Sequence, residues 1–416
     1  GNFEVQNMND PQTHSKNPDT FRRWGVLGGL FMIYMASNGI AMHTLPLLYP
    51  ELIETFGWSA TQVTLPATIL FVIGAFTSPP AGWLLDRFSP RIIILSGSII
   101  MAAALTFYAQ ISTLWQLVVI YGLLGAGLSL CGLVSNMVVL SSWFSTTRGR
   151  ATGILLMASS LGGTVFPLLV GQGLLAWGWR DTVSIVAFAT GATMIFSVLI
   201  FVRDHPSKVL RSNNVAPGQP KFSSVWPTLR QSQFFRIAFA TGALWFVIIA
   251  LTQHQSIYLA RDLGLSRENL PKVFSVFFAC SVIGKFGFGF LSDYFDKRLV
   301  MAASIIILGT SLAILSNINV HAPIFLYSYA VLAGIGFSGA FTCIQLLIAA
   351  YYVGPGYGRI LACLVLIDTL CGALGTRAIG MLRESMGSYR EPLIGMALLC
   401  VIAAITIATL KKPGTE

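Results

Sequence analysis

The sequence predicts an all-α membrane protein with twelve transmembrane helices arranged as two six-helix halves. Hydrophobic residues make up 55% of the 416 residues and charged residues only 10%, whereas soluble domains carry about 25% charged residues. The mean hydropathy is +0.73, and apolar runs of roughly 20 residues, the length a helix needs to cross a bilayer, recur along the whole chain. A β-barrel would instead show short segments of alternating polarity.

The expected helices fall into two groups of six, separated by a polar stretch. The predicted spans are 24–49, 60–84, 92–110, 115–142, 150–176 and 181–202, then 235–259, 271–292, 299–317, 323–350, 358–383 and 392–410. The stretch between the groups holds four prolines and several basic residues and is typical of a linker. The predicted organisation is an N-terminal tail (1–20), a first half (21–202), a linker (203–232), a second half (233–411) and a C-terminal tail (412–416).

Basic residues are unevenly distributed over the loops between these spans. With the N-terminus placed in the cytoplasm, 18 Lys and Arg residues lie on that side and 6 on the outer side, while Lys285 and Arg377 lie inside spans. The positive-inside rule therefore predicts a multi-pass protein of the cell (inner) membrane with both termini in the cytoplasm. The same rule explains the net charge of +10 without a nucleic-acid partner.

Short segments repeat between the two halves at a spacing of 207 residues. The repeated loop motif consists of Gly82, Asp86, Arg87 and Arg91 in the first half and Gly289, Asp293 and Arg298 in the second. The glycines would permit close helix approach, and the aspartates would cap a helix N-terminus or pair with an arginine. Such a latch would break when the halves rock apart. In addition, Gly57 matches Gly264, and Gly178 echoes Gly387.

With this motif and twelve helices, residues 20–410 resemble the major facilitator superfamily. Within that superfamily, segments 56–63, 142–153, 161–167, 373–376 and 387–390 are similar to the monocarboxylate porters and the bacterial oxalate:formate antiporters. The six-helix halves correspond to the parallel repeats of major facilitator transporters. The resemblance implies transport by alternating access.

Lys285 is a cation inside the apolar run of the eighth predicted helix. A charge in the hydrocarbon region is costly and normally faces a water-filled cavity, a counter-charge or an anionic substrate. In the resembled family a basic residue, usually arginine, four positions before the glycine of the second loop motif receives the substrate carboxylate, and counting back from Gly289 gives Lys285. Lysine keeps the charge but lacks the bidentate fork. Animal members carry an aspartate where this chain has Ser281, which puts their proton-coupling scheme in doubt here.

Two further titratable residues lie inside predicted spans. His43 aligns with a first-helix lysine of the animal members that takes part in proton and substrate binding, and histidine titrates near neutral pH. Alternatively, His43 only forms a hydrogen bond near the end of its helix. Asp368 is the only acid deep in a span, where a carboxylate would take up a proton or find a cation. Lys285 is its favoured partner, and Arg377 is the alternative.

Other intramembrane polar residues are candidates for substrate contact. Asn136 on the fourth helix and Tyr258 near the outer end of the seventh would contact the substrate, although helix contacts and interfacial anchoring would also account for them. Arg377 would form an outer anion site or snorkel to the headgroups. The sequence shows no Walker loop, enzyme constellation, cofactor site or metal site, so the driving force would come from an ion or exchange gradient.

Together these features predict a carrier, and not an enzyme, that moves a small organic anion, in the first instance a monocarboxylate. Transport would be coupled to protons or proceed by exchange, and the protein would function as a monomer in the bilayer. The alternatives are a carrier of larger carboxylates such as aromatic or siderophore-like acids, an efflux pump for amphipathic compounds, and a transport-like receptor. The phenylalanines of the eighth helix favour the efflux pump, whereas the receptor would need a soluble signalling domain.

Overall fold

The computed structural model describes residues 18–144, 147–204, 226–352 and 357–412. Most of both predicted tails and of the linker therefore lies outside the described part of the chain, as does the side chain of Asp86 in the loop motif. The described residues form helices and connecting turns, without strands. The predicted all-α fold class is thus confirmed.

The first half comprises helices α1 to α7. They are α1 (Pro18–Asn38), the π-helical turn η1 (Gly39–Thr44), the 3-10 turn η2 (Leu45–Leu48), α2 (Tyr49–Phe56), α3 (Ala60–Arg87), α4 (Pro90–Tyr108), α5 (Leu114–Cys131), α6 (Leu133–Trp143) and α7 (Arg148–Ile200). The expected first helix therefore continues without interruption through η1 and η2 into α2. The expected fourth helix is broken into α5 and α6 at Gly132, whose backbone is extended (φ −81°, ψ −154°).

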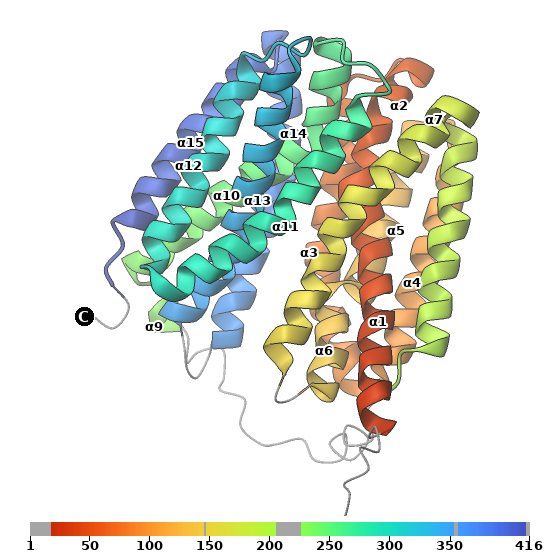
Figure 1. Cartoon of the computed structure of the whole chain (residues 1–416), viewed down its shortest axis with the longest axis vertical. Coiled ribbons are helices and arrows are strands. Elements are labelled where there is room, and N and C mark those ends of the chain that lie inside the picture. The colour runs from red at the N-terminus through yellow and green to blue at the C-terminus, as the bar shows by residue number, and fades with distance from the viewer. Residues whose placement is uncertain (1–17, 145–146, 205–225, 353–356, 413–416) are drawn as a thin grey trace, which may run out of the picture.

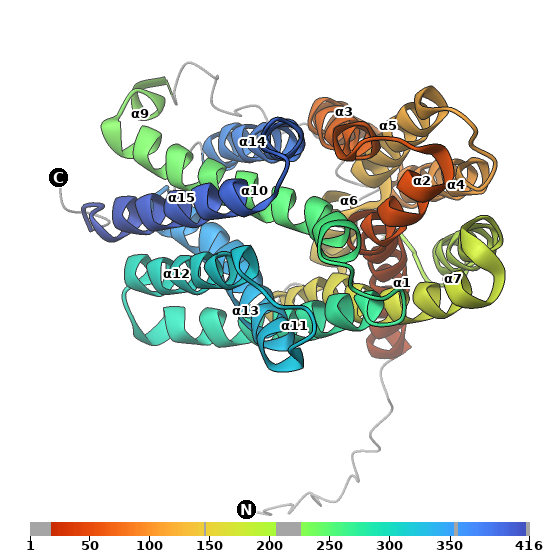
Figure 2. The ribbon, with the colours of Figure 1, turned by 90° about the horizontal axis from the view of Figure 1, so that it is seen from above.

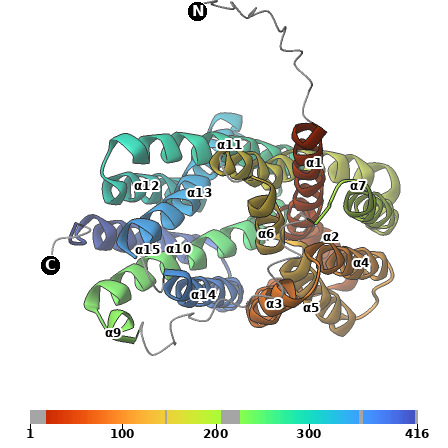
Figure 3. The ribbon, with the colours of Figure 1, turned by 90° about the horizontal axis from the view of Figure 1, so that it is seen from below.

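The second half follows the short helix α9 (Trp226–Leu229). Its elements are α10 (Ser232–Ile257), the π-helical turn η4 (Tyr258–Asp262), α11 (Leu270–Tyr294), α12 (Lys297–Ser316), α13 (Pro323–Tyr351), α14 (Tyr357–Met386) and α15 (Arg390–Ala408). Viewed from above, the two halves lie side by side (Figure 2), and the same division is visible from below (Figure 3).

Helix α7 accounts for two of the twelve expected spans. Eleven described helical segments are long and apolar enough to cross a membrane, but the 53 residues of α7 would measure about 80 Å as one straight helix. Gly178 interrupts it with φ 77° and ψ 173°, and Figure 1 shows α7 rising to one end of the bundle, bending and returning. The described chain therefore contains twelve membrane-spanning segments, as predicted.

The repeated glycines mark equivalent turns in the two halves. Among the described residues, positive φ values occur at Gly57, Gly178, Gly264 and Gly387 and nowhere else. These are the two pairs that the sequence repeat matched. A glycine adopts this backbone conformation without the penalty that a Cβ would bring, so each half turns at the same two points by the same means.

The two halves meet at one end of the bundle and diverge at the other. We call the end where α1 begins and α15 ends the terminal end, and the opposite end the distal end. The helices converge at the distal end and spread apart towards the terminal end (Figure 1). At the distal end the Tyr49 hydroxyl donates to Gln253 Oε1 at 2.6 Å, and the Ser256 hydroxyl donates to the Pro46 carbonyl oxygen at 2.5 Å.

Charged groups also join the halves at the distal end. Arg267 of the second half pairs with Glu51 at 3.0 Å and also with Glu54. The Glu384 carboxylate accepts a hydrogen bond of 3.0 Å from the backbone N–H of Thr61, in the first turn of α3, where a negative charge is favoured by the helix dipole. Polar contacts across the halves therefore close the distal end.

The Gly178 turn can be tested with a matched glycine. A Cβ would meet nothing within 4 Å at either Gly178 or Gly153, so only the backbone conformation separates the two positions. We expect Gly178→Ala to cost about 1–3 kcal/mol, because this φ/ψ region is essentially restricted to glycine, and Gly153→Ala to be neutral or stabilising. Thermal unfolding in detergent measures both. Equal melting temperatures for the two variants would contradict the argument.

Candidate functional site

The candidate site lies where α11 of the second half packs against the first arm of α7. Phe278, Ser281 and Lys285 are three and four positions apart and so share one face of α11. The helices approach closely because α7 presents glycines, and a Cβ on Gly163 or Gly171 would overlap the side chain of Phe278 or Pro271. This close packing brings the polar residues of the two helices within hydrogen-bond distance.

Lys285 forms its hydrogen bonds across the boundary between the halves. Its Nζ donates to Ser160 Oγ at 2.7 Å and to the Leu156 carbonyl oxygen at 3.2 Å. Ser281 Oγ lies 2.9 Å from the same Ser160 oxygen. Lys285 itself is partly buried, and it forms no ion pair within the described residues. Its ammonium group is thus held by neutral acceptors of the opposite half.

His43 reaches the neighbouring serine of the same helix. Its Nε2 lies 2.9 Å from Ser159 Oγ, and its ring centre is 4.1 Å from that of Phe278 on α11. Its Nδ1 is buried without a partner among the described groups. His43 belongs to η1, and π-helical turns occur frequently at functional sites. The structure thus brings His43 and Lys285 to adjacent hydroxyls, those of Ser159 and Ser160.

Asp368 lies elsewhere, and its expected pairing with Lys285 is wrong for this structure. The Asp368 carboxylate is 2% exposed and accepts a hydrogen bond of 2.7 Å from the Thr241 hydroxyl. The reason is the helix arrangement: α14 packs against α10 and α3, whereas α11 packs against α7, α12 and α13. The alternative partner, Arg377, does not pair with Asp368 either, since its guanidinium points to the Thr61 carbonyl oxygen at 3.5 Å.

Asn136 and Tyr258 are also separate from Lys285. Asn136 is fully buried, and its Nδ2 donates to the Cys131 carbonyl oxygen at 3.3 Å across the break at Gly132. Its Oδ1 has no partner in the described part of the chain. Tyr258 packs against Tyr389 with ring centres 5.5 Å apart. The structure does not place either residue beside Lys285, as the expected substrate contact would require.

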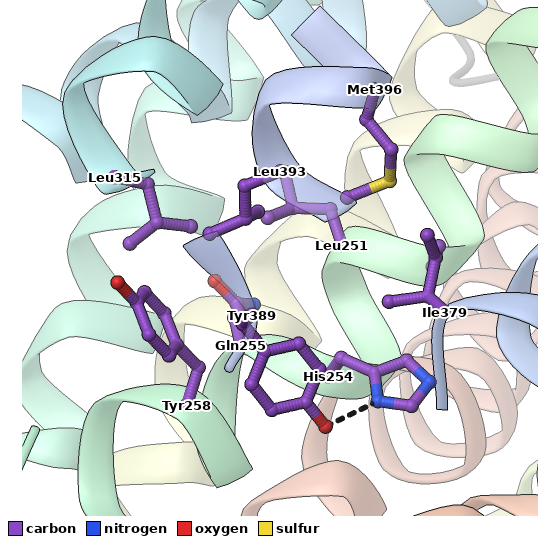
Figure 4. A pocket seen from close by; sticks show the side chains of 10 residues that line it. Leu251, His254, Gln255, Tyr258, Leu315, Ile379, Tyr389, Leu393 and Met396 are labelled. Atoms are coloured by element: carbon purple, nitrogen blue, oxygen red, sulfur yellow. Dashed lines mark hydrogen bonds between the residues drawn. The ribbon is translucent and has the colours of Figure 1, made fainter. Parts of the chain in front are cut away.

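Tyr258 lines a small cavity within the second half, seen from close by in Figure 4. His254 projects to this cavity, with Nδ1 2.7 Å from the Tyr389 hydroxyl oxygen and Nε2 2.8 Å from the Thr376 carbonyl oxygen. Because a carbonyl only accepts, Nε2 carries a proton. The cavity has a volume of about 10 Å³, which suits a single water molecule at most. It is too small for an organic anion.

The arginines of the repeated loop motif have equivalent roles in the two halves. Arg91 donates to the Leu199 carbonyl oxygen at 2.7 Å, and Arg298 donates to the Leu410 carbonyl oxygen. Each arginine thus caps the end of the last helix of its own half, where cations are favoured. A hydrogen bond from Arg298 holds the pKa of the Asp296 carboxyl below its usual value.

The other motif residues whose side chains the structure describes form no latch in this conformation. Asp293 is exposed and has no hydrogen bond or ion pair with the described groups. Arg87 stacks over Trp83 at 4.2 Å. The close helix approach expected at Gly82 and Gly289 is absent, because a Cβ would meet nothing within 4 Å at Gly82 and only an ordinary contact of 3.8 Å at Gly289. The helices have spread apart at this terminal end.

Sequence reasoning missed Ser159, Ser160 and Thr241. Serine and threonine inside a helix usually bond to their own backbone, so neither the Ser159-Ser160 pair nor Thr241 looked exceptional in apolar runs. The available signal was two adjacent hydroxyls directly before the glycines of the 161–167 segment.

Residues 26–270 and 254–416 match the sequence profile of the Major Facilitator Superfamily. The chain belongs to this superfamily. It is 26% identical to the oxalate:formate antiporter of Oxalobacter formigenes over 63% of this chain and 64% of that one. It is also 26% identical to monocarboxylate transporter 13 of Bos taurus over 89% of this chain and 85% of that one.

A solved structure shares the fold of this superfamily member. It is a bacterial homolog of the human lysosomal transporter Spinster in an inward-facing, occupied conformation, with a TM-score of 0.74 and 19% sequence identity. The match covers 93% of this chain and 96% of that one. The twelve-helix fold and the multi-pass membrane character therefore agree between the sequence and the structure, and the solved structure shares the fold.

The hydrogen bond between Thr241 and Asp368 leads to a prediction about the thermal stability of the protein. Thr241→Val leaves a buried carboxylate oxygen without its donor, which costs about 1–3 kcal/mol. The control is Thr310→Val, because Thr310 is exposed and donates only to Ile306 of its own helix at 2.8 Å. We expect a lower melting temperature for Thr241→Val alone, measured by thermal unfolding at neutral pH. A drop of equal size in the control would refute this assignment.

Proposed function

We propose that this superfamily member is a secondary active carrier of small organic anions, with monocarboxylates as the first candidates. The observation that carries the proposal is the Lys285 ammonium, which lies between the halves and has only neutral acceptors among the described groups. A cation at membrane depth is costly unless an opposite charge compensates it, and a substrate carboxylate would supply that charge. The names of two relatives, an oxalate:formate antiporter and a monocarboxylate transporter, support the same substrate class.

The charge count at the site favours a single carboxylate group. Among the described residues, Lys285 is the only lysine or arginine with a hydrogen bond across the contact between α7 and α11, and Arg377 lies near Thr61 at the distal end. A dianion held by two cations would need a second lysine or arginine, and the described residues provide none with a hydrogen bond across this contact. Larger aromatic carboxylates are a second candidate class, because Phe278 and Phe337 provide aromatic rings close to the site. Their rings meet edge to face with centres 6.2 Å apart.

The proposed coupling group is His43, because it and Lys285 bond to the hydroxyls of two consecutive residues, Ser159 and Ser160. Protonation of His43 would add a positive charge close to the bound anion, and the anion and proton would then cross together. Asp368 is the second candidate proton carrier, acting within the second half. We place the protein in the cell (inner) membrane as a monomer with its terminal end in the cytoplasm, which makes the distal closure the outer gate. Exposed Asp293 fits a cytoplasmic latch that is open.

Binding of carboxylates is the direct test of Lys285. Acetate, lactate, oxalate and benzoate are added to the purified protein, and thermal stabilisation is measured. We expect at least one monocarboxylate to stabilise the wild type. Lys285→Gln should abolish the effect and Lys285→Arg should retain it, because arginine keeps the charge. Lys272→Gln is the control, since Lys272 is exposed and pairs with Glu268 at 2.8 Å.

Two outcomes would overturn the assignment. One is stabilisation of the wild type and of Lys285→Gln to the same extent. The other is stabilisation by tetraphenylphosphonium, a lipophilic cation, and by none of the carboxylates, which would favour the rival efflux function.

Proton coupling is tested separately in proteoliposomes. A pH gradient, acid outside, should drive lactate uptake by the wild type. We expect His43→Gln to reduce gradient-driven uptake at least tenfold while lactate exchange across the membrane at equal pH persists. If His43→Gln keeps the full response to the gradient and Asp368→Asn loses it, the coupling role belongs to Asp368 instead.

A further inference from the structure

Helices α7 and α11 stay in contact from the distal end as far as Lys285. The contact begins where Gly171 meets Pro271 and continues where Gly163 meets Phe278. It ends with hydrogen bonds from α11 to Ser160 and Leu156. Closer to the terminal end, no hydrogen bond joins the two helices in the part of the chain that the structure describes. Lys285 therefore makes the last hydrogen bonds between the two helices on the way to the terminal end.

Ser160 is an unusual acceptor. Its hydroxyl is 1% exposed and lies within hydrogen-bond distance of both Ser281 and the Lys285 ammonium, whereas a helical serine commonly bonds to its own backbone. An ammonium group has three protons to donate, and two of them are used here, one on Ser160 and one on the Leu156 carbonyl oxygen. The opposite half thus provides a neutral, incomplete substitute for a carboxylate.

We infer that Ser160 is a positioning residue that clamps Lys285 to the first half in the empty carrier, and that the transported anion displaces it. Opening of the distal end separates α7 from α11 and so pulls the ammonium away from both acceptors. Without an anion nothing replaces them, which leaves a poorly solvated cation at membrane depth. With an anion bound, the carboxylate replaces them. The clamp thus slows reorientation of the empty carrier and favours exchange over net movement.

The role of the anion in this inference rests on the proposed function, whereas the clamp itself is a property of the empty protein. Its readout can therefore be taken without any substrate. The Thr61 amide reports on the distal closure, because its hydrogen bond to Glu384 crosses the halves and breaks when they separate. Hydrogen–deuterium exchange of the first turns of α3 measures how often this happens.

The experiment compares full-length, detergent-purified variants without ligand. Ser160→Ala and Lys285→Gln remove the clamp, whereas Ser160→Thr keeps the hydroxyl. Ser311→Ala is the matched control, because Ser311 is equally buried but donates to Leu308 of its own helix at 2.6 Å. We expect exchange at the start of α3 to become at least threefold faster in Ser160→Ala and Lys285→Gln. It should stay at the wild-type rate in Ser160→Thr and Ser311→Ala.

Hydrogen–deuterium exchange in α15 should be unchanged in every variant, because α15 packs against α10, α12 and α14 and not against the two helices that carry the clamp. Two results would overturn the clamp proposal. One is faster hydrogen–deuterium exchange throughout the chain in Ser160→Ala, and the other is an exchange rate at the start of α3 in Ser160→Ala that equals the rate in Ser311→Ala. The second part of the experiment measures lactate transport in proteoliposomes. Ser160→Ala should lower the ratio of lactate–lactate exchange to net lactate efflux at least threefold. An unchanged ratio in a variant that still transports lactate overturns the exchange bias.

Failure of the proposed function would look different. In that case no carboxylate would stabilise the wild type and lactate would not be transported, while Ser160→Ala and Lys285→Gln would still speed exchange at α3. The clamp would then stand as a property of the fold without its assignment to an anion.

Discussion

The need to hold an ammonium group at membrane depth without a carboxylate partner shapes the centre of this protein. Lys285 meets that need by bonding to Ser160 and to the Leu156 carbonyl oxygen of the opposite half. Those bonds require α7 and α11 to lie close together, and closeness requires glycines on α7 where Phe278 and Pro271 pack. The position of one charged side chain is thus connected to the packing of two helices over most of their shared length.

The two halves reach equivalent structures through the same local chemistry. Each turns at two glycines with positive φ, and each uses an arginine of the repeated loop motif to cap the carbonyls that end its last helix. The halves differ in the groups that they bring to their common boundary. The first half provides hydroxyls and a histidine, and the second half provides the lysine. The second half also holds, on another helix, the one aspartate deep in a described span, Asp368, which accepts a hydrogen bond from Thr241. The proposed function therefore depends on the asymmetry between two similar bundles.

Closure at one end and separation at the other are parts of a single arrangement. The distal end is joined by neutral hydrogen bonds such as Tyr49 to Gln253 and by charged contacts such as Glu51 with Arg267. At the terminal end the motif glycines have no close neighbours and Asp293 has no partner among the described groups. An opposite conformation would exchange these roles, because both ends cannot pack closely while rigid halves rock about the centre.

The sequence by itself determined the fold class, the number of spans, the internal repeat and the presence of a cation, Lys285, at membrane depth, because hydropathy, glycine and charge are strong local constraints. It also indicated His43 together with Lys285. Only the tertiary structure decided the partners: it joined Lys285 to Ser160, gave Asp368 to Thr241, and put Asn136 and Tyr258 elsewhere. Partners depend on which helices pack together and with what rotation, and a periodic apolar pattern leaves both open. The break at Gly132 and the uninterrupted passage from α1 into α2 escaped prediction for a similar reason, since hydropathy is blind to backbone geometry within an apolar run.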